Sequence, residues 1–170
     1  MLFSEIIGQN EIKKRLIRSV TEQRIPHAQL FMGPEGVGKL GLALAYARYV
    51  ACLNRSETDA CGVCTACTKF NKLAHPDLHF VFPVIKPKSK SSVVCDDFIK
   101  EFREIALRSP YFTVQEWFAK ISDDAKQGVI YGNESEEIIR KLSLKTYESG
   151  TATHLRCNLN ISDFILAPVG

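Results

Sequence analysis

Apolar side chains along residues 1–150 recur at two spacings, one typical of amphipathic helices and the other of short buried strands. The first spacing predicts helices over residues 11–24, 39–51, 65–74, 96–108, 113–121 and 134–148. Short apolar runs predict buried strands at residues 28–32 and 78–82. The order strand, turn, helix, strand, helix predicts an α/β fold in which helices flank a parallel sheet.

The last twenty residues, 151–170, differ from the rest of the chain. They show no convincing period, and we predict no strand among them. We interpret residues 1–150 as a partial domain and residues 151–170 as a divergent tail, which we expect to be disordered or read from a shifted frame.

Composition narrows the class of protein without naming a function. The chain has 170 residues, of which 45% are hydrophobic and 24% charged, as expected for a globular domain with its own core. A net charge of +3 is too small to predict nucleic-acid binding by itself. Neither a run of about 18 apolar residues nor a secretory leader is visible, so we expect a cytoplasmic protein that does not contact a membrane.

A glycine-rich turn lies between the first predicted strand and the buried helix. Residues 33–39, Gly-Pro-Glu-Gly-Val-Gly-Lys, match the first seven positions of the phosphate-binding motif G-x-x-x-x-G-K-[ST]. In such a loop the backbone amides surround a phosphate, the helix N-terminus adds partial positive charge, and Lys39 would reach the β- and γ-phosphates. The residues expected to contact nucleotide here are Gly33, Gly36, Val37, Gly38, Lys39 and Leu40.

Leu40 stands where the motif requires Ser or Thr, whose hydroxyl binds Mg²⁺. Without that oxygen, magnesium binding is doubtful and ATP hydrolysis should be weak or absent. ATP binding through the backbone and Lys39 stays open, as does the alternative of a structural turn that binds nothing. We name no catalytic residue.

Four of the six cysteines fall within sixteen positions, with the spacing C-x8-C-x2-C-x2-C. In a reducing cytosol such a cluster favours metal binding over disulfides. Tetrahedral zinc requires four soft ligands, and closely spaced thiolates supply them. We therefore predict a structural zinc module over residues 52–67, with the ligands Cys52, Cys61, Cys64 and Cys67.

Other assignments of the cysteines remain open at this point. An iron–sulfur site also uses C-x2-C-x2-C, but its run continues C-x3-C-P, and position 71 is Asn. His75 or Cys95 could replace Cys52 as the fourth ligand. The simplest alternative is a set of free, partly buried thiols.

Together these motifs resemble the γ/τ and δ′ subunits of the clamp loader of bacterial DNA polymerase III, which have the AAA+ fold. The most distinctive feature is the four-cysteine module directly after a phosphate-loop helix. The stretches that carry the resemblance are residues 3–9, 24–28, 33–39, 52–67 and 75–77. In the family the first of these lines the adenine pocket, which implies contacts from Ile7 and Gly8.

The resemblance implies a role in DNA replication, with other loader subunits, the sliding clamp and primed DNA as partners. Motor subunits keep Thr at the position of Leu40, so a δ′-like role without hydrolysis is favoured. The family pattern also calls for a strand ending in acidic Walker B residues after Gly150, and residues 151–170 contain no Asp-Glu pair. We therefore expect a domain that is incomplete at its C-terminal side.

Two other functions compete with this interpretation. A free-standing P-loop NTPase or kinase is disfavoured by Leu40 and by the missing Walker B aspartate. A non-enzymatic zinc module that binds protein or DNA would need a basic face, for which Lys69 and Lys72 give little support.

Overall fold

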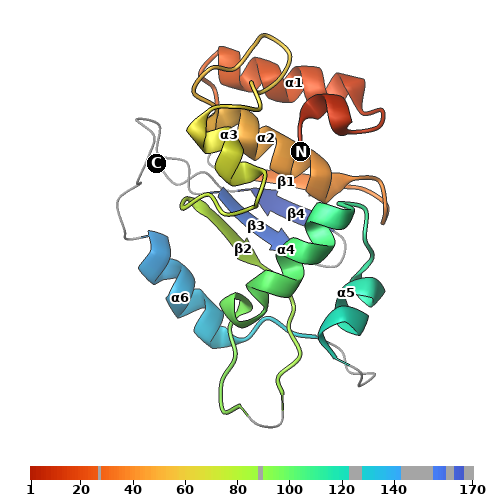
Figure 1. The fold of residues 1–170 in the computed structure, drawn as a ribbon, viewed down its shortest axis with the longest axis vertical. Coiled ribbons are helices and arrows are strands. Elements are labelled where there is room, and N and C mark those ends of the chain that lie inside the picture. The colour runs from red at the N-terminus through yellow and green to blue at the C-terminus, as the bar shows by residue number, and fades with distance from the viewer. Residues whose placement is uncertain (27, 88–89, 123–127, 143–154, 160–162, 167–170) are drawn as a thin grey trace.

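A single sheet with helices packed around it forms the framework of the protein (Figure 1). The computed structural model describes residues 1–26, 28–87, 90–122, 128–142, 155–159 and 163–166. The helices are η1 (Phe3–Glu5), α1 (Asn10–Thr21), α2 (Lys39–Ala51), α3 (Thr65–Phe70), η2 (Cys95–Phe98), α4 (Ile99–Arg108), α5 (Val114–Ile121) and α6 (Gly132–Leu142). The strands are β1 (Gln29–Met32), β2 (Leu78–Val81), β3 (Leu155–Leu159) and β4 (Asp163–Leu166).

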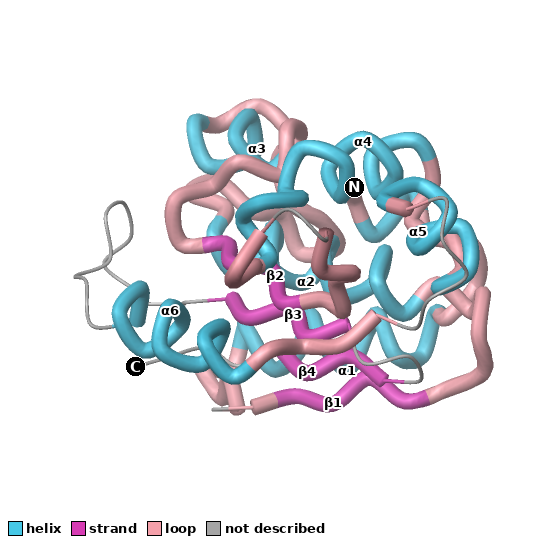
Figure 2. Tube along the Cα trace, turned by 90° about the horizontal axis from the view of Figure 1, so that it is seen from below, coloured by secondary structure: helices cyan, strands magenta, loops and turns pink. Residues whose placement is uncertain are grey.

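The sheet has the strand order β1-β4-β3-β2, and Figure 2 shows the strands one after another from β2 to β1. Strand β2 pairs with β3 in parallel, whereas β3 with β4 and β4 with β1 are antiparallel. The sheet is therefore mixed, and the expectation of a parallel sheet was wrong. The physical reason is the short connection between β3 and β4, because only a long crossover can bring consecutive strands into parallel pairing.

The prediction that residues 151–170 contain no strand was also wrong. Strands β3 and β4 lie there and occupy the two central positions of the sheet. The missed signal is the alternation of apolar and polar residues in Leu-Arg-Cys-Asn-Leu, residues 155–159. The expectation that the tail is disordered or read from a shifted frame stays a prediction, and the rest of this segment lies outside the described residues.

Most predicted helices occur close to their expected bounds. Helix α2 covers residues 39–51 as predicted, whereas α3 ends at Phe70, four residues before its expected end. Helix α1 begins at Asn10, one residue before its expected start, and Gln9 takes the N-cap position. The predicted helix over residues 134–148 begins earlier, at Gly132, and its last six residues lie outside the described part.

The core is built around α2, which lies between α1 and the strands β1 and β4 (Figure 1). Every residue of this helix after Lys39 is buried. A second part of the core is aromatic: the rings of Phe82 and Phe102 stack with centroids 4.5 Å apart, and Trp117 packs edge-on at 5.0 Å from Phe82. Its indole Nε1 donates to the carbonyl oxygen of Pro83 at 2.8 Å, which satisfies the buried polar atom.

Among the helices that the structure describes, none combines the length and the apolar character needed to cross a bilayer.

Candidate functional site

The glycine-rich loop and the cysteine cluster lie at opposite ends of the same helix. The loop leads into α2 through its N-cap residue Gly38, and Cys52 is the C-cap residue directly after the last residue of α2. Because α2 is the central element of the core, both sites are attached to the most rigid part of the molecule.

The loop has the backbone conformation for which its glycines are needed. Gly36 and Gly38 have φ angles of +75° and +88°, values that favour glycine strongly over other residues. The ring of Tyr111 lies directly over the second of them, since a Cβ added at Gly38 would sit 2.7 Å from the Tyr111 Cε1 atom. Glycine is therefore required at position 38 for two independent reasons.

Lys39, which would bind phosphate, is held by its own loop. Its ammonium group donates hydrogen bonds to the carbonyl oxygens of Gly33 and Pro34, the latter at 2.8 Å. The loop is also joined to α5, because the carboxylate of Glu35 accepts a hydrogen bond from the Val114 amide at 3.4 Å. Phosphate binding would require the Lys39 ammonium to exchange the two carbonyls for phosphate oxygens.

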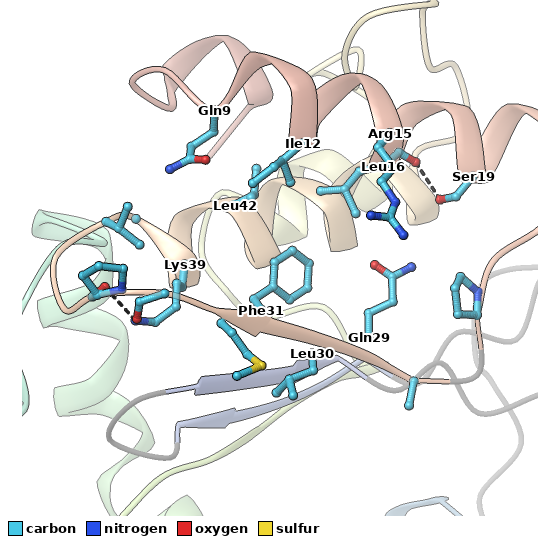
Figure 3. A pocket seen from close by; sticks show the side chains of 17 residues that line it. Gln9, Ile12, Arg15, Leu16, Ser19, Gln29, Leu30, Phe31, Lys39 and Leu42 are labelled. Atoms are coloured by element: carbon cyan, nitrogen blue, oxygen red, sulfur yellow. Dashed lines mark hydrogen bonds between the residues drawn. The ribbon is translucent and has the colours of Figure 1, made fainter.

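A cavity of about 610 Å³ opens beside the loop, between α1, β1 and the N-terminal end of α2 (Figure 3). Its volume is in the range of small-molecule sites. Apolar side chains such as Phe31 and Ile12 point into it, and polar groups come from Gln9 and Arg15 (Figure 3). The nucleotide-binding residues predicted from the sequence that line this cavity are Gly33, Val37, Gly38 and Lys39.

The four predicted cysteine ligands come together in space. Their sulfur atoms all lie within 4.8 Å of one another. The Cys52–Cys64 and Cys61–Cys67 sulfur pairs are each 4.0 Å apart, too far for a disulfide. Four thiolates about 2.3 Å from a tetrahedral zinc would be separated by about 3.8 Å, so the cluster fits a zinc ion closely.

Backbone amides around the cluster favour the thiolate form that metal binding needs. The Cys64 amide donates to the Cys61 sulfur at 3.4 Å, and the Cys61 amide donates to the Cys52 sulfur at 3.3 Å. Hydrogen bonds from the amides of Val63 and Cys64 lower the pKa of the Cys61 thiol to about 6. Burial has the opposite effect on Cys52, whose pKa it raises to about 12.

The family model described as DNA polymerase III, delta subunit, matches residues 8–152. The chain belongs to this family.

Individual relatives support the same assignment over part of the chain. The DNA polymerase III subunit delta′ of Bacillus subtilis is 39% identical over 75 residues, which is 44% of this chain and 22% of the relative. The gamma/tau subunits of Mycoplasma pneumoniae and Mycobacterium bovis are 36% identical over 69 residues and 32% identical over 108 residues, or 41% and 64% of this chain. The chain matches only 10–22% of the length of these three relatives.

The other residues predicted to contact nucleotide, which lie outside the cavity lining, are Ile7, Gly8, Gly36 and Leu40. Ile7 is exposed, and its amide donates to the Tyr111 hydroxyl at 3.4 Å. Gly8 has a φ angle of +64° and open space around it, while Leu40 is buried in the core. Nucleotide contacts from all of these residues stay predictions.

The two other candidates for the fourth metal ligand do not belong to the cluster. The Cys95 thiol donates to the carbonyl oxygen of Phe82 at 3.2 Å, and burial raises its pKa. His75 is buried against the ring of Phe70, with centroids 4.9 Å apart. The geometry therefore favours Cys52 as the fourth ligand.

Two residues that matter for these sites were missed from the sequence. Tyr111, which covers the glycine-rich loop, lies between two predicted helices, and nothing in the sequence around it indicates a role at this site. Arg48, which donates a hydrogen bond to the carbonyl of Gly62 inside the cysteine module, did give one. It is the only charged residue after Lys39 in an otherwise apolar helix, and such a residue needs a buried partner.

Proposed function

We propose that this chain acts in the bacterial clamp loader as a δ′-like subunit. In this role it would assemble with other loader subunits in the cytoplasm and help them place the sliding clamp on primed DNA. The observation that carries the proposal is the match of residues 8–152 to the DNA polymerase III delta-subunit family. The relatives named delta′ and gamma/tau support it.

The proposed role of the cysteine module is to bind one zinc ion as a structural element. Zinc would be held by Cys52, Cys61, Cys64 and Cys67, whose mutual distances support a tetrahedral site. Four protein thiolates leave no open coordination position for water or substrate, so the ion would stabilise the fold and not catalyse a reaction. It would join the end of α2 to the loop and helix that follow.

The proposed nucleotide site binds ATP weakly and hydrolyses it slowly or not at all. Leu40 offers no oxygen to magnesium, and its side chain is packed into the core. Lys39 is engaged by the carbonyl oxygens of Gly33 and Pro34, and ATP would have to displace them. Both observations support a sensory or residual site rather than a motor.

The test combines assembly, metal content and nucleotide turnover on the purified chain. We expect copurification with gamma/tau subunits of the same organism, about one zinc per chain by elemental analysis, and little phosphate release from ATP. Fluorescent ATP titrated with and without Mg²⁺ measures binding separately. Robust hydrolysis without assembly would instead favour a free-standing P-loop NTPase, and zinc binding without either would favour a non-enzymatic zinc module.

A further inference from the structure

Arg48 is a buried positive charge without an ion-pair partner among the described residues. It lies near the C-terminal end of α2 and is only 3% exposed. Its Nη1 and Nη2 atoms donate to the carbonyl oxygens of Met1 at 3.3 Å and Gly62 at 3.2 Å. Carbonyls are neutral acceptors, and the buried Nε atom has no hydrogen-bond partner in the described part of the chain. A buried guanidinium needs a compensating negative charge.

The cysteine cluster is the group that can supply this charge. The guanidinium donates to the carbonyl oxygen of Gly62, which lies between the ligands Cys61 and Cys64. Burial raises the pKa of the Cys67 thiol in the same cluster, and the interaction with Arg48 partly opposes that rise. Four thiolates around a divalent ion carry a net charge of about −2, most of it on the sulfur atoms. This charge and the Arg48 guanidinium are therefore complementary.

We propose that Arg48 is the counter-charge and positioning residue of the four-thiolate metal centre, and that through it the centre holds the N-terminal segment in place. The inference rests on the proposed zinc binding. Without the metal centre Arg48 would lose this partner, and its hold on both carbonyls would weaken. Loss of Arg48 would in turn leave the centre with uncompensated buried charge.

The N-terminal segment is attached to the cysteine module at a second point, which makes the connection specific. The carboxylate of Asp59 accepts hydrogen bonds from the amides of Phe3 at 3.0 Å and Ser4 at 2.9 Å. Asp59 lies two residues before the ligand Cys61, in the loop that the metal would close. Metal binding should therefore protect the first residues of the chain.

The first experiment measures zinc affinity of the full chain by competition with a chromophoric chelator. Arg48→Met should bind zinc about 10- to 100-fold more weakly, the usual effect of removing a partner of a metal ligand. Arg48→Lys, which keeps the charge, should recover part of the affinity. Arg55→Met is the matched control, because Arg55 donates to the Tyr49 and Val50 carbonyls at the same end of α2.

The second experiment follows amide hydrogen exchange at residues 1–7 with zinc at saturation. Exchange of the Phe3 and Ser4 amides should accelerate in Arg48→Met and on chelation of zinc from the wild type, and stay slow in Arg55→Met. Should Arg48→Met not fold, the chelation experiment on the wild type decides. Zinc affinity equal to that of the wild type in Arg48→Met, or unchanged exchange on chelation, overturns this inference alone. Absence of zinc binding by the wild type overturns the proposed metal centre itself.

Discussion

Replacing Leu40 by threonine restores the residue that the phosphate-loop motif requires, and it tests why the site should lack motor activity. Residue 40 is the second residue of α2, directly after the loop. The threonine hydroxyl is attached to the Cβ atom, so it would lie near the backbone and hence near the loop. We expect Mg²⁺ to strengthen ATP binding about tenfold in this variant, equivalent to about 1.4 kcal/mol, and to have little effect in the wild type.

The same substitution should cost stability, because Leu40 is only 3% exposed. Leu40→Val removes one buried methylene and should cost about 1 kcal/mol. Leu40→Thr has the same shape as Leu40→Val but replaces a buried methyl by a hydroxyl, which adds about 1–2 kcal/mol. The expected total for threonine is about 2–3 kcal/mol, which a domain of ordinary stability tolerates.

Leu40→Val is therefore the matched control, since it differs from Leu40→Thr by the hydroxyl alone. Urea unfolding would measure the stability of both variants, and fluorescent ATP titrated with and without Mg²⁺ would measure binding. A magnesium effect in Leu40→Thr but not in Leu40→Val supports the reasoning. Equal behaviour of the two variants would refute it, and the hold of the loop carbonyls on Lys39 would then be the remaining obstacle to ATP.

Two further predictions concern the loop and the thiols. Gly38→Ala should lower the free energy of unfolding by about 2–3 kcal/mol, because it adds left-handed backbone strain and displaces the Tyr111 ring. Gly8→Ala, which has open space around it, should lose only about 1–2 kcal/mol from backbone strain. Equal losses of the two variants in urea unfolding would contradict the contact between Gly38 and Tyr111. Among the five cysteines whose burial the structure describes, iodoacetamide at pH 7 should modify Cys61 of the metal-free chain first, since its pKa of about 6 leaves it mostly thiolate. The rate should fall as the pH is lowered through 6. Of the same five, buried Cys95, with its raised pKa, should react last, and mass spectrometry of the modified peptides would give the order.

The parts of the fold that the sequence predicts well are those with strong local signals. Helix α2 has an apolar run with a glycine-rich turn before it and a cysteine after it, and the structure reproduces its bounds. The closeness of the Cys61, Cys64 and Cys67 sulfurs was also predictable, because two overlapping Cys-x2-Cys spacings leave little freedom in where these thiols lie. In each of these cases the information lies within a few residues along the chain.

The parts that the sequence did not predict depend on contacts between distant segments. The direction of β4 relative to β1 is set by how the β3–β4 pair enters the sheet, which no periodicity encodes. Tyr111 reaches Gly38 across more than seventy residues, so its role is visible only in three dimensions. The strand β3 is a different case, since its sequence does alternate between apolar and polar residues. Five residues of alternation, in a segment with no longer period, were too short a pattern to predict a strand.

The N-terminal segment connects the cysteine cluster to the glycine-rich loop along the side of α2, in addition to the connection through the helix itself. The helix has 13 residues and is about 20 Å long, so the loop and the metal centre are too far apart for direct coupling. The N-terminal segment spans this distance: Met1 and Phe3 are bound at the metal end, while a Cβ at Gly41 would lie 2.9 Å from Ile6 Cδ1. The next amide, that of Ile7, donates to the tyrosine that covers the loop. Metal binding at the proposed centre would therefore reach the glycine-rich loop by fixing this segment, whereas a change inside α2 would have to distort the core to do the same.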